Sequence, residues 1–107
     1  MAEGDKKAGH PRACDYARSF SKGWERLARS GRHDLRALKE AMLLLIANDA
    51  PLGPEWKDHP LKGEWQGFRE CHIGGDFLLI YEVDDTAGKA GTVHFVRAGT
   101  HSDLFGE

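Results

Sequence analysis

Residues 77–83, Phe-Leu-Leu-Ile-Tyr-Glu-Val, restrict the possible folds of this chain more than any other segment. Both parities of the segment are apolar: one set is Phe77, Leu79 and Tyr81, and the other is Leu78 and Ile80. Successive side chains of a β-strand point to opposite faces of its sheet, so a strand that is apolar on both parities belongs in the middle of a sheet. We therefore predict a sheet with residues 77–83 as its central strand.

Two further strands are predicted, one on each side of this segment along the chain. Residues 68–73 form the first, and a tight turn at Gly74 and Gly75 connects it to the central strand. A polar loop at residues 84–91 leads into the third strand, which covers residues 92–98. The sheet is therefore expected to be antiparallel.

A short extended segment and a helix are predicted near the start of the chain. The extended segment covers residues 12–17, after which Phe20, Trp24 and Leu27 recur at helical spacing. Gly31 is expected to end this first helix, because glycine is common just after the last helical turn.

A second helix is predicted to begin after Asp34, which can cap it, and to end where residues 48–51 read Asn-Asp-Ala-Pro. Its apolar stripe is wide, which indicates heavy burial: Leu35, Leu38, Ala41, Met42, Leu43, Leu44, Leu45 and Ile46. Since the connection between the two helices is short, they are expected to form an antiparallel hairpin.

The expected architecture is a single α+β domain at residues 12–107, with a helical hairpin that covers one face of the sheet. Residues 1–11 are polar and are predicted to be a disordered tail. The other face of the sheet is left open at least in part. It is flanked by a Pro- and Gly-rich loop at residues 51–63 and by the C-terminal tail, so it is a credible place for a substrate.

Charge is unevenly distributed between the two halves of the chain. Residues 1–50 hold 10 Lys and Arg against 7 Asp and Glu, whereas residues 51–107 hold 5 against 10, which gives the net charge of −2. Affinity for phosphates comes chiefly from Lys and Arg, so this balance argues against nonspecific RNA binding. The basic residues of the helical hairpin are the candidates for contacts with RNA phosphates, with a solvated helix face as the equal alternative: Arg26, Arg29, Arg32, Arg36 and Lys39.

No segment is expected to cross a membrane. The longest apolar run, residues 41–47, is far shorter than the roughly 20 residues that span a bilayer. The N-terminal residues lack the apolar core of a secretory signal, so a cytoplasmic location is expected. Cys14 and Cys71 show no Cys-x-x-Cys spacing, so free thiols are expected and a disulfide framework is not.

Four of the six histidines lie in the second half of the chain: His59, His72, His94 and His101. Imidazole has an ordinary pKa of about 6.5, so converging histidines suit general acid–base chemistry near neutral pH. A zinc site is the opposing interpretation. The sequence has no His-x-His, His-x-x-x-His or Cys-x-x-Cys pair, so zinc ligands would have to come together by tertiary folding alone.

The second half of the chain also resembles a known family in several spaced blocks. These blocks are Trp-Lys-Asp-His-Pro-Leu at residues 56–61, Gly-x-Trp-x-Gly-Phe-Arg-Glu-x-His at 63–72, Asp-Phe-x-Leu-Ile-Tyr at 76–81, and Arg-x-Gly-Thr-His-x-x-Leu-Phe at 97–105. In this set and order the blocks resemble the YafQ branch of the RelE-like bacterial toxins. The helical hairpin is consistent with that branch in position and length.

The resemblance implies a RelE/ParE-like α+β fold, in which a helical hairpin packs on a small antiparallel-dominated sheet and a C-terminal arm carries catalytic residues. Members of the branch are ribosome-dependent mRNA endonucleases that a cognate antitoxin protein holds inactive. Residue by residue, the resemblance implies catalytic roles for His59, His72, Asp76 and His101, and a nucleotide-positioning role for Phe105. It implies the antitoxin, the ribosome and translated mRNA as partners, and neither a cofactor nor a metal.

Cleavage of RNA without a metal needs a base for the ribose 2′-hydroxyl, stabilisation of the charged transition state, and an acid for the departing 5′-oxygen. His101 is expected to be the acid, because the C-terminal end is predicted to be a mobile arm that can close over the leaving group. The base and orienting roles are shared among His59, His72 and Asp76, and the sequence does not divide them.

Each of these candidates also has a purely structural interpretation. His59 could be a loop histidine that satisfies backbone carbonyls, and His72 could be a half-buried strand residue. Asp76 follows two glycines and could cap their turn. His101 is harder to explain in this way, since it stands after a Gly-Thr pair close to the end of the chain.

Two arginines are expected to neutralise the substrate phosphate, because a guanidinium group is well shaped for that contact. Arg97 falls where the family pattern also has arginine, and Arg69 is the second candidate. Arg97 could instead pair with Glu70 or Glu82 across the sheet, although an exposed pair contributes only about 0–1 kcal/mol to stability.

The leading hypothesis from the sequence is a toxin of a type II toxin–antitoxin system that cleaves translated mRNA. A RelE/ParE-like toxin without catalytic activity, which inhibits a protein target such as DNA gyrase, is the alternative. Toxins of that kind lack the histidine set found here.

Overall fold

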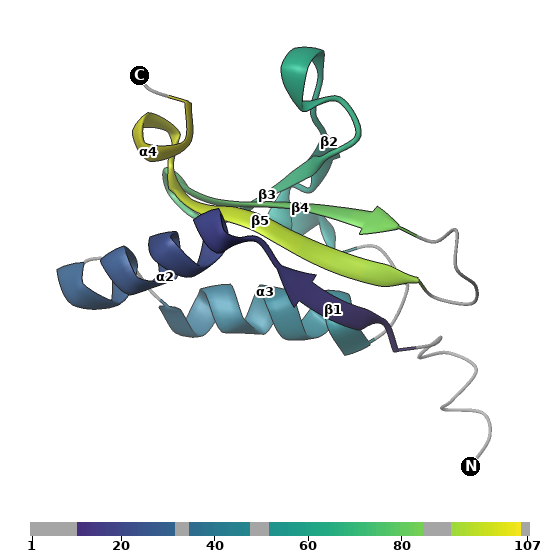
Figure 1. Ribbon diagram of the computed structural model, residues 1–107, viewed down its shortest axis with the longest axis horizontal. Coiled ribbons are helices and arrows are strands. Elements are labelled where there is room, and N and C mark those ends of the chain that lie inside the picture. The colour runs from purple at the N-terminus through teal and green to yellow at the C-terminus, as the bar shows by residue number, and fades with distance from the viewer. Residues whose placement is uncertain (1–10, 32–34, 48–51, 85–90, 106–107) are drawn as a thin grey trace.

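The computed structural model describes residues 11–31, 35–47, 52–84 and 91–105. Two helices lie along one face of a twisted sheet, and a shorter helix and a loop lie over the other face (Figure 1). The predicted tail at residues 1–11 falls almost wholly outside the described residues, as do the predicted cap Asp34 and the helix break at 48–51.

The sheet has five strands in the order β1-β5-β4-β3-β2. In chain order they are β1 (Ala13–Tyr16), β2 (His59–Pro60), β3 (Arg69–Gly74), β4 (Phe77–Asp84) and β5 (Thr92–Thr100). The prediction of β4 as the central strand is confirmed, and five of its residues from Phe77 to Tyr81 are buried.

The sheet is mixed rather than wholly antiparallel. β1 pairs parallel with β5, with Cys14 opposite Val93, whereas the other three pairs are antiparallel. The extended segment was predicted from the sequence, but its partner was not. Two helices separate β1 from the other strands, so the chain returns to the sheet in a direction that local pattern does not reveal.

Helices α2 (Arg18–Ser30) and α3 (Leu35–Ala47) cover one face of the sheet, as predicted for the helical hairpin. Gly31 ends α2 in the left-handed conformation (φ 65°), and its N–H donates to the carbonyl of Leu27 at 3.3 Å. Gly23 lies against β5: a Cβ atom there would be 2.9 Å from the carbonyl oxygen of Ala98. Glycine at this position therefore allows α2 to pack closely on the sheet.

The main core lies between the helices and the sheet, and a smaller cluster lies on the opposite face. The main core includes Phe20, Leu27, Leu38, Ala41, Leu45, Cys71, Phe77, Leu79, Tyr81, Val93 and Phe95. The smaller cluster contains Leu78, Ile80 and Leu104, with Leu61, Trp65, Phe68, Val96 and Phe105 packed around it. Thus the second face is covered in part and remains open beside this cluster. No helix in the described residues is long and apolar enough to cross a membrane.

Two segments near the open face are more ordered than predicted. The loop at 51–63 contains the 3₁₀ turn η1 (Pro54–Trp56) and strand β2, and a second turn, η2 (Gly63–Trp65), follows. At the C-terminus β5 continues through the predicted Gly-Thr turn, and the arm is helix α4 (His101–Phe105) with Leu104 buried. Long-range pairing to β3 and packing on Leu78 and Ile80 order these segments.

Candidate active site

The register of the sheet brings His59, Glu70 and His72 to the open face. Glu70 pairs with Ile80 and His72 pairs with Leu78, and both of these partners belong to the apolar cluster on that face. His59 in β2 pairs with Glu70. Because paired residues share a face, the three side chains point away from the helices.

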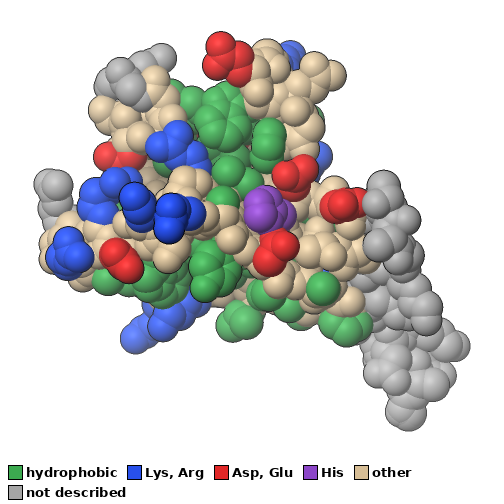
Figure 2. Space-filling model, viewed as in Figure 1, with side chains coloured by type: hydrophobic (Ala, Val, Ile, Leu, Met, Phe, Trp, Pro, Cys, Tyr) green, Lys and Arg blue, Asp and Glu red, His purple; other side chains and the backbone are tan. Residues whose placement is uncertain are grey.

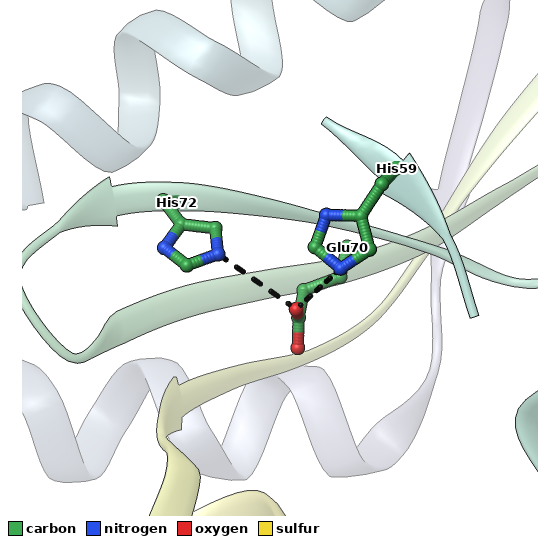
Figure 3. A group of neighbouring side chains, drawn as sticks. All are labelled: His59, Glu70 and His72. Atoms are coloured by element: carbon green, nitrogen blue, oxygen red, sulfur yellow. Dashed lines mark ion pairs between the residues drawn. The ribbon is translucent and has the colours of Figure 1, made fainter. Parts of the chain in front are cut away.

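One carboxylate oxygen joins the two imidazoles of this group. Glu70 Oε1 lies 3.0 Å from His59 Nε2 and 3.9 Å from His72 Nε2 (Figure 3). The Glu70 side chain is only 6% exposed, and the two imidazole rings lie 5.9 Å apart. Their ligand atoms all lie within 4.8 Å of one another, so the three residues could hold a metal ion.

The hydrogen bonds of His59 determine where its protons lie. His59 Nδ1 is 2.8 Å from the carbonyl oxygen of Lys57, which can only accept, so Nδ1 carries a hydrogen. Nε2 then faces the carboxylate of Glu70. The distance from Nε2 to Oε1 of Glu70 is 3.0 Å, so Nε2 is the nitrogen at which His59 can exchange a proton.

Asp76 and His101 form a second carboxylate–imidazole pair. Asp76 precedes β4 and His101 begins α4, and the Nδ1 atom of His101 donates to Asp76 Oδ1. The backbone N–H of His101 also donates to Oδ1, at 3.4 Å. Both side chains are exposed, at 47% for His101 and 58% for Asp76. Since Asp76 engages Nδ1, proton exchange by His101 must use Nε2.

The two groups lie on opposite sides of β4. His72 pairs with Leu78, which in turn pairs with Gly99, two residues before His101. Two interstrand spacings separate β3 from β5, which is about 10 Å. A phosphodiester bound over β4 would therefore have one imidazole group on each side.

Aromatic rings connect the C-terminal arm to the loop before β3. The Trp65 ring lies 5.5 Å from Phe68 and 5.9 Å from Phe105, and Phe105 lies 6.0 Å from His101. These rings offer surfaces on which a nucleotide base can stack. Phe105 was predicted for this role, whereas Trp65 and Phe68 were not.

The two arginines expected to bind phosphate lie in different places. Arg97 pairs with Ile80, so it lies on the open face, and its Nη1 donates to the carbonyl oxygen of Leu104 at 3.3 Å. Among the described residues no ion pair links it to Glu70 or Glu82. Arg69 pairs with Tyr81, and its Nε donates to Asp58 at 2.6 Å, away from the histidines.

Glu70 is the site residue that sequence reasoning missed. It was considered only as an ion-pair partner for Arg97. Its position two residues before His72 in a predicted strand places both on one face, and this was the available signal. His94 lies outside both groups and pairs with Asp15 of β1.

Comparisons with known proteins agree on one family. The family model described as a bacterial toxin of type II toxin–antitoxin systems, YafQ, matches residues 12–106. The mRNA interferase toxin YafQ of Escherichia coli K12 is 41% identical over 95 residues, which cover 89% of this chain and 97% of the relative.

Two solved structures show the same fold. The E. coli DinJ–YafQ toxin–antitoxin complex contains a chain with a TM-score of 0.75 and 40% identity, and the match covers 89% of this chain and 98% of that one. A metal-bound toxin from Helicobacter pylori has a TM-score of 0.71 and 38% identity, over 88% and 99% of the two chains.

Proposed function

The chain belongs to the YafQ family of toxins from bacterial type II toxin–antitoxin systems, and we propose that it is an endoribonuclease that cleaves mRNA on the ribosome and so arrests translation. One observation supports this function most directly. Two carboxylate–imidazole groups lie on either side of β4 on the open face of the sheet.

In the proposed reaction the His59–Glu70–His72 group takes the proton of the ribose 2′-hydroxyl. The 2′-oxygen then attacks the adjacent phosphorus. Glu70 offsets the positive charge that develops on the imidazoles, and its burial strengthens this effect, because charges interact more strongly away from water.

His101 supplies the proton to the departing 5′-oxygen. As the bond from phosphorus to the 5′-oxygen breaks, Nε2 of His101 gives up its proton, so the products are a 2′,3′-cyclic phosphate and a 5′-hydroxyl. Asp76 orients the ring through Nδ1, Arg97 lies on the same face to neutralise phosphate charge, and Phe105 stacks on a base.

The ribosome is the proposed source of substrate, and α2 is the proposed contact for its RNA. Arg18, Lys22, Arg26 and Arg29 are three or four residues apart and exposed, opposite the buried face of the helix. Figure 2 shows Lys and Arg gathered over α2. No described acidic residue forms an ion pair with any of the four. Their charge is therefore available to phosphates.

We also propose that a cognate antitoxin protein binds and neutralises this chain in the cytoplasm, as a DNA-binding complex. An E. coli relative with 40% identity forms a toxin–antitoxin complex with DinJ. Ribosomes that translate mRNA are cytoplasmic, so the proposed substrate requires the same location.

A transition-metal ion is proposed as an inhibitor of this site rather than a cofactor. His59, Glu70 and His72 offer two nitrogens and an oxygen with the spacing that Zn²⁺ or Cu²⁺ accepts. A bound ion would use the nitrogen lone pairs that the base requires. The metal-bound toxin from H. pylori shows that a relative takes a metal.

The test is to express wild type, His59→Ala and His101→Ala and to map mRNA ends by primer extension. We expect wild type to cut translated mRNA in phase with codons, to act far more slowly on naked RNA, and to lose about 10²–10⁴-fold in rate in either variant. Intact mRNA beside inhibited DNA gyrase would instead favour the non-catalytic alternative.

A further inference from the structure

A polar network lies beneath the site, on the helix side of the sheet, at the start of β2. Asp58 Oδ1 accepts a hydrogen bond from Arg69 Nε at 2.6 Å, and Asp58 Oδ2 accepts one from the hydroxyl of Tyr81. The Asp58 side chain is 9% exposed, and Tyr81 belongs to the main core. Both oxygens of one buried carboxylate are therefore bonded to residues of two adjacent strands, β3 and β4.

Asp58 is also the residue immediately before His59. The preceding residue, Lys57, has a left-handed backbone (φ 50°) that ends the 3₁₀ turn, and its carbonyl oxygen accepts the Nδ1 hydrogen of His59. A non-glycine residue in this conformation costs energy, so the surrounding contacts must hold it there. The two hydrogen bonds of Asp58, together with the pairing of β2 with β3, hold this backbone against the sheet.

We propose that Asp58 is a positioning residue for the catalytic reaction and that it acts through His59. It holds the 57–59 backbone at a fixed height and angle relative to β3, so that the ring of His59 meets Glu70 at 3.0 Å. This proposal rests on the proposed function, in which His59 takes part in proton transfer.

The role requires a carboxylate, because two donors converge on Asp58 from different strands. An asparagine has one acceptor oxygen, so its amide nitrogen would face either the Arg69 guanidinium or the Tyr81 hydroxyl. Burial lowers the pKa of Arg69, but the hydrogen bond and charge of Asp58 outweigh burial and leave the pKa raised. Burial and the hydrogen bond to Asp58 raise the pKa of Tyr81. Both groups thus remain donors at neutral pH.

This network also explains why Arg69 does not lie with the histidines. Its neighbour Glu70 points to the open face, and strand alternation turns Arg69 to the other face, where it meets Asp58. The strand therefore supplies a residue of the site at position 70 and an anchor for the loop that carries His59 at position 69.

The experiment is a double-mutant cycle on single-turnover cleavage of ribosome-bound mRNA. Asp58→Asn is combined with His59→Ala in one arm and with His101→Ala in the other. Alone, Asp58→Asn is expected to lower kcat about 10- to 100-fold with little change in KM, because a small misplacement of a catalytic group has effects of this size. In the His59→Ala background it should have almost no further effect, and in the His101→Ala background it should keep its full effect.

A merely structural role would give a different pattern. Asp58→Asn would then lower the rate equally in both backgrounds, and that outcome would overturn the proposal. Tyr81→Phe is the second variant, since it removes one hydrogen bond and keeps the buried ring. It should show the same dependence on His59 with a smaller effect, of about 3- to 10-fold, and thermal unfolding identifies any variant that does not fold.

The outcomes also separate this proposal from the proposed function. If wild type leaves translated mRNA intact, the proposed function fails. If wild type cleaves mRNA and His59→Ala and His101→Ala cleave it equally fast, the proposed catalytic histidines fail, and Asp58 has no catalytic histidine to position. If both variants are impaired but Asp58→Asn lowers the cleavage rate by the same factor in each of them, only the positioning role fails.

Discussion

The two carboxylate–imidazole groups of this protein use the same residue types in opposite environments. Glu70 is buried on β3 and reaches two imidazoles, whereas Asp76 is exposed beside a turn and holds one. A buried charge interacts strongly with its neighbours, while an exposed one is weakened by water. The difference indicates that the environment of each carboxylate determines the role of its imidazoles. The His59–Glu70–His72 group suits proton uptake with charge stabilisation, and the Asp76–His101 pair suits proton delivery by an oriented ring.

The assignment of His101 as the acid and the His59 group as the base is tested most directly with a substrate whose leaving group does not need an acid. An mRNA with sulfur in place of the 5′-oxygen at the cut releases a thiolate, which leaves without protonation. We expect His101→Ala to lose about 10²–10⁴-fold on normal mRNA and to recover most of that loss on the sulfur substrate. His59→Ala should gain little on it. If His101→Ala and His59→Ala regain the same share of their lost rate on the sulfur substrate, the assignment of His101 as acid and His59 as part of the base is wrong.

The two carboxylates provide the next largest test. Glu70→Gln and Asp76→Asn each remove a charge with almost no change of shape. We expect a loss of about 100-fold or more in kcat for Glu70→Gln and about 10-fold for Asp76→Asn, because only the carboxylate of Glu70 is shielded from water. Single-turnover rates at saturating ribosome concentration measure both. Equal losses would show that burial does not separate the two groups.

Metal binding should also distinguish the groups. Zn²⁺ titrated at constant Mg²⁺ is expected to inhibit wild type, and His72→Ala should need about 10- to 100-fold more Zn²⁺ for the same fractional inhibition of its residual activity. Asp76→Asn should keep wild-type sensitivity, since Asp76 is not among the three described residues that could share an ion. Stimulation of wild type by Zn²⁺ would contradict an inhibitory role.

The smallest expected effect concerns how well water is excluded from β3, the strand that carries Glu70. Cys71 lies between Glu70 and His72 but faces the helices, and burial, with added repulsion from Asp58 and Glu70, raises the pKa of its thiol to about 12. From about pH 9 upward the unfolded chain loses this proton and the folded chain keeps it, so stability falls as pH rises.

Cys71→Ala removes this contribution. Its free energy of unfolding should fall less steeply than that of wild type between pH 9 and 11, by at most about 1.4 kcal/mol per pH unit. Urea unfolding across this range measures the slope, and Cys14→Ala, which alters an exposed thiol, is the control. Identical slopes for Cys71→Ala and wild type would mean that water reaches the strand beneath the site.

The elements that sequence reasoning predicted are those whose cause is local. β4 is apolar on both parities, and α2 ends at a glycine in the left-handed conformation, so each pattern is visible in a few consecutive residues. The histidines could be singled out because their chemistry is specific and because the family resemblance covers their positions. Glu70 could not be separated from an ordinary strand glutamate, since its role depends on where His59 lies.

The amino-acid sequence by itself determined the helical hairpin, the central strand, the predicted set of His59, His72, Asp76 and His101, and the family. Tertiary structure alone decided that these residues form two groups rather than one, that Glu70 joins the first, and that Arg69 turns away to Asp58. The physical reason is register. Pairing between strands distant in sequence determines which side chains lie next to one another on each face of the sheet. Short-range periodicity does not predict these partners.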